Sequence, residues 1–183
     1  TDVLKSGFID KSITVSKEYQ PRLLYNDYKE NMKLSYDLNQ LLKECDTFDI
    51  SVAFINKSGL AVLKQTLLEL KRINKKGRIV TSTYLGFNQP DTFRELLTFS
   101  NLDVRIYDGD KGFHSKGYIF KKNDYYQVII GSSNLTQSAL SENQEWNFYF
   151  TSMKDGEVVE QVTTEFEKQW NSSIILTEEW IKE

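Results

Sequence analysis

The first two thirds of the chain alternate between two hydrophobic patterns, one typical of helices and the other of buried strands. In the helical stretches the apolar residues recur three or four positions apart, and Asp27 and Ser58 are the expected N-caps of the first two helices. The predicted helices occupy residues 27–44, 58–77 and 91–99, and the predicted strands occupy 48–55, 78–84 and 104–107. Strand, helix and strand in succession imply right-handed crossovers between parallel strands.

The pattern changes in the last third, where strands predicted at 114–121, 125–133 and 144–150 follow one another with short gaps. Such gaps favour antiparallel neighbours. A final amphipathic helix is expected to turn its apolar residues inward, namely Val158, Val159, Val162, Phe166 and Trp170. The predicted fold class is therefore α/β, with a mixed parallel and antiparallel sheet flanked by helices.

The predicted domain organisation is simple. Residues 1–26 carry scattered apolar side chains without a sustained period, which indicates an extended leader. Residues 27–183 are expected to form a single domain, because a chain of 183 residues with 39% hydrophobic and 27% charged side chains suits one core. The start at Thr1 rather than Met, and a helical pattern that continues to Glu183, suggest a piece of a longer protein.

The balance of charges and the single cysteine restrict the partners and the cellular compartment that we expect for the protein. The chain has 23 Lys and Arg against 26 Asp and Glu, so any affinity for nucleic acid must come from a local patch. A single cysteine, Cys45, cannot form an internal disulfide, and no apolar run is long enough for a signal peptide or a membrane span. A cytoplasmic protein without a membrane partner is expected.

Candidate chemistry centres on His114, the only histidine of the chain. The period of a strand places His114 and Lys116 on one face, as close neighbours. A hairpin turn near residues 122–124 would bring Ser132 and Asn134, which follow Gly131, roughly opposite them. Imidazole, ammonium, hydroxyl, amide and exposed backbone N–H groups are the parts of a phosphate-binding site that contains a nucleophile.

Each of these residues also has an ordinary interpretation. A lone histidine is more often a surface or core residue than a nucleophile. Lys116 alone would be a solvated lysine at a strand edge, and residues 132–134 alone would be a turn or an N-cap before Leu135. Two polar clusters that meet across one predicted hairpin favour an active site over these separate readings.

The spacing His114-x-Lys116 followed by Gly131-Ser132-x-Asn134 resembles the HxK and GSxN signature of the phospholipase D superfamily of phosphodiesterases. The resemblance implies that His114 attacks phosphorus to form a phosphohistidine, without a metal or any other cofactor. It further implies that Lys116, Ser132 and Asn134 hold the non-bridging oxygens. Ser133 is counted with them as phosphate-binding, through the small-residue backbone of the motif.

The order of predicted elements is similar to the phospholipase D-like fold from about residue 24 to residue 170. Many members of the superfamily have Asp five residues after the motif lysine, where this chain has Lys121. Similar variants occur among the restriction endonucleases and helicase-linked nuclease domains of the superfamily. Residues 21–26 and the form Gly-Ser-Ser-Asn-Leu-Thr are most similar to domains placed N-terminal to superfamily II helicases.

A histidine nucleophile needs one ring nitrogen unprotonated and the other held by an acceptor. Glu145, on the next predicted strand, is the candidate acceptor, and it resembles the glutamate that follows GSxN in nuclease members. The alternative is an exposed strand carboxylate. Trp146 is interpreted as core packing rather than as a platform for base stacking.

The sequence gives weaker evidence for a metal site and for a nucleic-acid-binding surface. The nearest semblance of a carboxylate metal site is Asp91 with Glu95, a spacing that usually marks a solvated helix face. The basic run at residues 71–78 ends a predicted helix, where the helix dipole alone favours cations. The basic residues expected to guide a phosphate backbone toward the motif are Arg105, Lys111, Lys121 and Lys122.

Together these observations predict a metal-independent phosphodiesterase or nuclease that acts on nucleic acid, with DNA favoured over RNA as the substrate. It is expected to be a module of a helicase or restriction-type protein. The alternative is a degenerate module that binds phosphate without turnover. Phospholipid hydrolysis ranks last, because the sequence offers no membrane-binding segment. Superfamily members use a second histidine as the acid, and this chain has one histidine, so a homodimer with a shared site is expected. The alternative is a histidine supplied by another domain of the full-length protein.

Overall fold

The computed structural model describes residues 15–83, 89–109 and 112–182. Within them an eight-stranded sheet runs in the order β1-β7-β6-β5-β2-β3-β4-β8. Its strands are β1 Arg22–Leu24, β2 Thr47–Val52, β3 Gly77–Thr81, β4 Leu102–Tyr107, β5 Lys116–Lys122, β6 Tyr125–Gly131, β7 Asn147–Met153 and β8 Ser173–Ile175. The helices are the short 3₁₀ helix η1 Lys17–Tyr19 and the α-helices α2 Leu34–Glu44, α3 Lys57–Arg72, α4 Pro90–Leu97, α5 Gln137–Ser141, α6 Glu157–Asn171 and α7 Glu178–Lys182.

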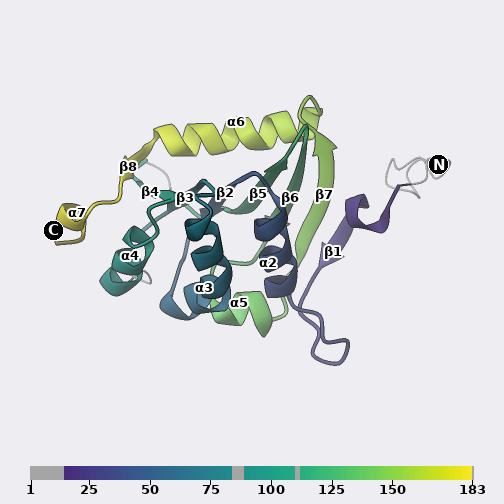
Figure 1. The fold of residues 1–183 in the computed structure, drawn as a ribbon, viewed down its shortest axis with the longest axis horizontal. Helices are drawn as coiled ribbons and strands as arrows, with labels where there is room; N and C mark the ends of the chain where they lie inside the picture. Colours follow the sequence, from purple (N-terminus) through teal and green to yellow (C-terminus); the bar gives the residue numbers. More distant parts are fainter. Residues whose placement is uncertain (1–14, 84–88, 110–111, 183) are drawn as a thin grey trace.

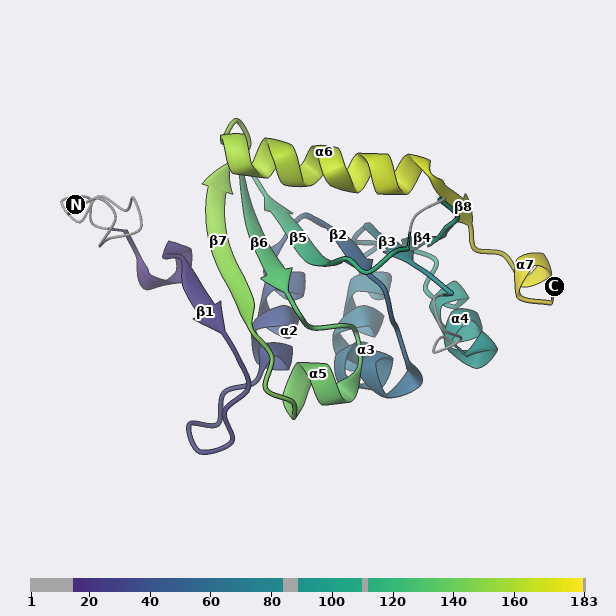
Figure 2. The ribbon, with the colours of Figure 1, turned by 180° about the vertical axis from the view of Figure 1, so that it is seen from behind.

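The sheet is mixed, as the spacing of the elements predicts. Strands β2, β3 and β4 are parallel neighbours, whereas β5, β6 and β7 form an antiparallel meander that joins them through β2. Helices α2, α3 and α5 cover one face of the sheet, and α6 crosses the other (Figures 1 and 2). The expected α/β class with flanking helices is therefore confirmed.

Each face of the sheet packs its own apolar layer. The larger cluster lies toward α2 and α3 and includes Leu38, Leu42, Leu63, Phe48 and Phe120. The smaller cluster lies toward α6 and includes Val80, Ile119, Val128, Val159 and Phe166. Val158 was expected inward with its helix neighbours, but its side chain is 55% exposed, because it precedes the buried stripe that Val159 begins.

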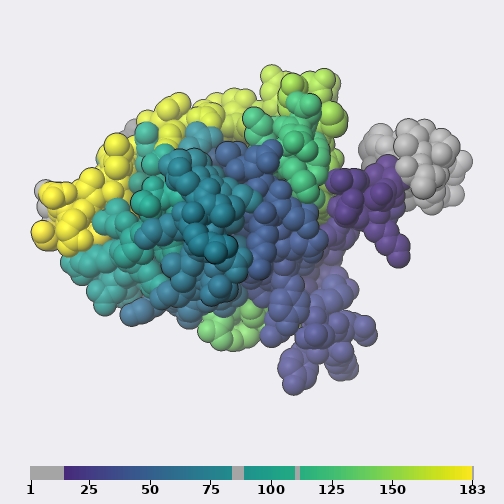
Figure 3. Space-filling model, viewed as in Figure 1, coloured from purple at the N-terminus to yellow at the C-terminus, as the bar shows by residue number. Residues whose placement is uncertain are grey.

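The first long helix begins at Leu34 and not at Asp27. Asp27 instead pairs with Met32 through two backbone hydrogen bonds, and its carboxylate accepts from the backbone N–H groups of Lys29 and Glu30. A side chain that binds its own turn in this way competes with helix formation. The turn at 27–32 projects from the body of the domain in Figure 3, and Tyr28 within it is 96% exposed.

The N-cap of α3 is Asn56 rather than Ser58. The Asn56 amide oxygen accepts from the backbone N–H of Gly59 at 2.8 Å, and the Ser58 hydroxyl donates to the same oxygen. The helix ends at Arg72, short of Gly77. Gly77 opens β3 instead, where a β-carbon would collide with the buried ring of Phe48.

The segment expected as an extended leader lies partly outside the described residues. Its described part contains η1 and then β1, which pairs antiparallel with β7 and so forms one edge of the sheet. No helix among the described residues has the length and apolar character needed to cross a bilayer.

Candidate active site

The two motifs lie at the same end of one β-hairpin. Strands β5 and β6 pair with Gly117 opposite Ile130, so the register continues with Lys116 opposite Gly131. The turn expected at residues 122–124 is confirmed, with Asn123 in the left-handed conformation at φ 51°. Strand β6 ends at Gly131, where the second motif begins, and the chain then runs toward α5 (Figure 2).

The imidazole and the ammonium of the HxK motif are in contact. Lys116 Nζ lies 3.0 Å from His114 Nδ1 and donates to the His114 carbonyl oxygen at 2.9 Å. The His114 side chain is exposed, and its ring meets the ring of Phe54 edge-on at 6.1 Å between centroids. The motif therefore presents a solvent-accessible imidazole with a positive charge beside it.

The ammonium of Lys116 is partly desolvated. Burial lowers the pKa of Lys116 below its usual value, and the negative charge of Glu145 opposes part of that shift. A partly buried cation interacts more strongly with an anion than a solvated one does, because the local dielectric is lower. Lys116 is thus suited to bind a phosphate oxygen.

Ser132 and Glu145 are joined across the ends of β6 and β7. The Ser132 hydroxyl donates to the Glu145 carboxylate and accepts from the backbone N–H of Trp146 at 3.1 Å. The backbone N–H of Ser132 donates to the Trp146 carbonyl oxygen at 3.1 Å. Because Glu145 also acts on the charge of Lys116, this contact connects the GSxN segment to the HxK segment.

Asn134 is held from the side of β2. Its amide oxygen accepts from the backbone N–H of Phe54 at 3.1 Å, which leaves the amide N–H₂ group as the donor that can meet an anion. The next residue, Leu135, donates to the Phe54 carbonyl oxygen at 3.0 Å. Gly59 approaches the Leu135 carbonyl so closely that a β-carbon would collide with it, so α3 helps to fix this segment.

Ser133 does not belong to the surface of the site. Its side chain is fully buried, its hydroxyl accepts from the Asn147 amide at 2.9 Å, and its N–H donates to the Asn147 amide oxygen. The interpretation of Ser133 as phosphate-binding is corrected accordingly, because successive residues of an extended chain point to opposite sides. Asn147 was not anticipated, since its partner lies 14 residues earlier and no local pattern marks the pair.

The expected contact of Glu145 with His114 stays a prediction, whereas the surroundings of Trp146 differ from expectation. The Glu145 carboxylate receives the Ser132 hydroxyl, while the Nδ1 atom of His114 faces Lys116. Trp146 was expected in the core, yet its side chain is 74% exposed. The residue precedes β7, and the register places it beyond the last pair of the ladder, where α6 does not cover the sheet.

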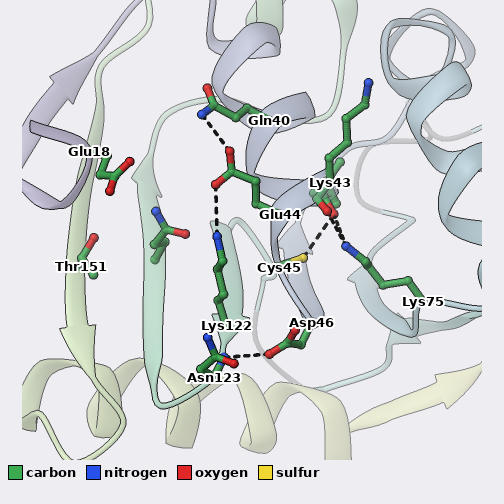
Figure 4. Close-up of polar contacts among 12 residues, drawn as sticks. Glu18, Gln40, Lys43, Glu44, Cys45, Asp46, Lys75, Lys122, Asn123 and Thr151 are labelled. Atoms are coloured by element: carbon green, nitrogen blue, oxygen red, sulfur yellow. Dashed lines mark hydrogen bonds and ion pairs between the residues drawn. The ribbon is translucent and has the colours of Figure 1, made fainter.

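Most of the basic residues expected as guides lie away from the motifs. Arg105 on β4 packs on the Trp170 ring and donates to the Trp170 carbonyl oxygen. Lys121 and Lys122 lie at the other end of β5, about 17 and 20 Å from Lys116 at roughly 3.3 Å per residue. Lys122 there pairs with Glu44, among the polar contacts of Figure 4. Lys111 lies outside the described residues.

The carboxylates considered as a metal site are ion-paired on the surface. Asp91 pairs with Arg94, and Glu95 pairs with Lys64 at 3.0 Å. Over residues 15–83, 89–109 and 112–182, no three His, Cys, Asp or Glu side chains gather in a way that could hold a metal ion.

Replacing Glu145 with Gln should lower the pKa of Lys116 further. The carboxylate raises that pKa, so its removal leaves the desolvation of the ammonium less opposed. The Lys116 signal in a ¹³C-lysine NMR titration, assigned with Lys116→Arg, would then lose its proton at a lower pH than in the wild type. The same replacement at Glu142, an exposed acid of the same loop, serves as the control. An unchanged Lys116 titration in Glu145→Gln would separate Glu145 from the site.

Comparison with known proteins agrees with this geometry. The family model described as "Cardiolipin synthase, PLD-like domain" matches residues 38–170, which is more than half of the chain and includes both motifs. No curated protein sequence matches the chain.

Similar folds are found among solved structures. NucT from Helicobacter pylori superposes with a TM-score of 0.63 at 18% identity, over 85% of this chain and 98% of that one. The phospholipase D family member Nuc from Salmonella typhimurium gives 0.66 at 16% identity, with the same coverage. Phosphatidylserine synthase from Haemophilus influenzae gives 0.66 at 16% identity, over 90% of this chain and 41% of that one. With the motifs at one end of a hairpin and a family model spanning both, the chain belongs to the family of phospholipase D-like domains.

Proposed function

We propose that the protein is a metal-independent phosphodiesterase that cleaves nucleic acid, with His114 as its nucleophile. The observation that carries this proposal is the contact between the exposed His114 imidazole and the Lys116 ammonium, beside the Ser132 hydroxyl and the Asn134 amide. A nucleophile and several anion-binding donors at the same end of neighbouring strands are suited to attack on a phosphodiester.

The reaction has two steps. A nitrogen of His114 forms a bond to phosphorus while the bond from phosphorus to the leaving oxygen breaks, and that oxygen takes up a proton. Water then attacks phosphorus and gives its proton to the group that protonated the leaving oxygen, the nitrogen–phosphorus bond breaks, and the imidazole is restored. Lys116, Ser132 and Asn134 bind the non-bridging oxygens, whose charge grows as the new bond forms.

The contact between Lys116 and His114 bears on the first step. Lys116 Nζ lies within hydrogen-bond distance of His114 Nδ1, and an ammonium can donate to that nitrogen in the tautomer that carries its proton on the other ring nitrogen. An anionic phosphodiester would draw the ammonium to its own oxygens and away from Nδ1 of His114. The imidazole can then place its proton on either nitrogen, and the nitrogen that faces phosphorus carries the lone pair.

The alternative is a module that binds phosphate without turnover, suggested by Lys121 in place of the usual aspartate. Lys121 is exposed and lies at the opposite end of β5 from Lys116. The substitution therefore removes no group from the vicinity of His114. This placement favours an active enzyme over a degenerate one.

The finer assignment rests on the residues alone. The segment 21–26 and the Gly-Ser-Ser-Asn-Leu-Thr form support a DNA-cleaving module of a helicase or restriction-type protein. Of the basic residues considered as guides, Arg105, Lys121 and Lys122 are engaged or placed away from the motifs, so the support for phosphate binding comes from Lys116 of the HxK motif itself.

We also propose that the active unit is a homodimer. The chain has one histidine, and the leaving oxygen needs an acid. Exposed apolar side chains lie beside the motifs. Ile130 on β6 is paired with Phe148 on β7, and Trp146, the residue before β7, is exposed as well. An apolar surface next to the site is suited to a second copy of the chain.

The proposal is tested by turnover in the presence of a chelator. The purified chain is expected to hydrolyse bis(p-nitrophenyl) phosphate and to nick plasmid DNA in excess EDTA, at rates close to those without it. Binding of DNA without turnover would favour the non-catalytic module instead. Turnover that disappears in EDTA and returns with a divalent cation would refute the metal-independent reaction.

A further inference from the structure

The HxK segment is contacted from α6 by a side chain that lies far away in the sequence. The Gln169 amide N–H₂ donates to the Ser115 hydroxyl at 2.9 Å, and Ser115 is the residue between His114 and Lys116. The Gln169 amide oxygen accepts from the Ser51 hydroxyl on β2 at 2.6 Å. One side chain thus bridges the sheet and the motif.

The bridge has a defined direction. Ser51 is buried, at 5% exposure, and its hydroxyl donates to the amide oxygen of Gln169, so the amide nitrogen is turned toward Ser115. The backbone of Ser115 is held as well, because its carbonyl oxygen accepts from the Ala53 N–H at 3.0 Å. The residue between the two motif side chains is therefore fixed from β2 and from α6.

Helix α6 is fixed against the sheet close to Gln169. Phe166 and Trp170, on either side of Gln169, are buried against the sheet, and the Arg78 guanidinium lies over both rings. Arg78 is itself bound to Asp49 on β2 and to Glu167 on α6. The position of Gln169 relative to β2 is thus set by packing and by ion pairs.

Apolar packing holds the HxK segment at Phe113, which is buried under α6, but leaves space beside Ser115 and Lys116. A hollow of about 230 Å³ lies between α6 and the β5–β6 hairpin, bordered by Ser115, Lys116 and Gln169. A β-carbon built on Gly117 would have nothing within 4 Å. Beside this space the hydrogen bonds of Ser115 add to the β2–β5 ladder and to the packing of Phe113 in fixing the segment.

We propose that Gln169 is a positioning residue that holds His114 and Lys116 in their reactive geometry through Ser115. This inference rests on the proposed function but is testable apart from it. A displacement of the reacting groups by about 1 Å can cost roughly 100-fold in rate, so loss of the bridge is expected to lower kcat by about 10- to 100-fold. The KM should change less, because the phosphate donors remain.

The kinetic test uses Gln169→Leu, Ser115→Ala and the double variant. Both single variants should lower kcat for bis(p-nitrophenyl) phosphate by similar factors, and the double variant should be no slower than the slower single, because all three lack one interaction. Ser115→Thr, which retains a hydroxyl, should recover most of the lost rate. Gln161→Leu is the matched control, because Gln161 is exposed on the same helix.

The second readout needs no turnover. The chain has one histidine, so its imidazole signals in an NMR spectrum belong to His114. They should shift or broaden in Gln169→Leu and Ser115→Ala but not in Gln161→Leu. Unchanged imidazole signals, kcat losses that add in the double variant, or losses matched by a fall in folded protein would overturn the proposal. Perturbed signals in a chain without hydrolysis would support the positioning role while refuting the proposed reaction.

Discussion

Replacement of His114 by alanine should reduce phosphodiester hydrolysis by at least about 10³-fold, because the proposed nucleophile is the only imidazole of the chain. The exposed imidazole contributes little to packing, so the melting temperature should stay close to that of the wild type. Quenching with detergent at alkaline pH, where a phosphorus–nitrogen bond is stable, during turnover of a ³²P-labelled substrate should leave labelled protein in the wild type and none in His114→Ala. A variant that retains hydrolysis or labelling would exclude His114 as the nucleophile.

Lys116→Ala is the companion variant, with an expected loss of about 10²- to 10³-fold in kcat, typical of removing one donor to a developing oxyanion. Its contacts with His114 are local to the motif, so folding should be preserved. Asn134→Ala is a less clean test. Its amide oxygen accepts from the Phe54 N–H, and losing that bond costs about 1 kcal/mol of stability in addition to any loss of rate.

Much of the fold could be predicted because its elements carry strong local patterns. The apolar run at 48–55 marks β2, and the short gaps after residue 114 mark the antiparallel strands β5, β6 and β7. The helix boundaries could not be predicted where they depend on hydrogen bonds from side chains that lie outside the hydrophobic pattern of the helix. The Asn26 amide oxygen accepts from the Leu34 N–H and so defines the start of α2, whereas Asp27 is used in its own turn.

The candidate site follows the same division. The period of a strand and one hairpin turn suffice to bring His114, Lys116 and Ser132 to the same end of the sheet. The burial of Ser133 and the exposure of Trp146 depend on where the β6–β7 ladder ends, which the hydrophobic pattern does not specify. The contact of Gln169 with Ser115 joins residues 54 positions apart, so no local pattern could reveal it.

A mixing experiment should show that each active site needs two chains. If His114 of one chain attacks and His114 of its partner protonates the leaving oxygen, only dimers of two wild-type chains are active. Subunit exchange with a nine-fold excess of His114→Ala would then leave about 1% of the activity of an all-wild-type sample, where independent sites would leave about 10%. Light scattering should give a dimer in both preparations.

The exposed apolar residues beside the motifs provide the structural counterpart of this test. Trp146 and Phe148 are 74% and 50% exposed, an arrangement that costs little only if another surface covers them. Trp146→Asp or Phe148→Asp should therefore yield monomers, because a two-fold interface places each introduced charge against its own copy or the same apolar surface. Tyr28→Asp is the control, because it also replaces an exposed aromatic side chain with a carboxylate, but in the turn that projects away from the sheet. It should remain a dimer. The monomeric variants should lose hydrolysis while keeping the His114–Lys116 contact within each chain, since that contact comes from one strand. A fully active monomer, or activity that tracks only the wild-type fraction after exchange, would refute the shared site and require the acid to come from within the chain.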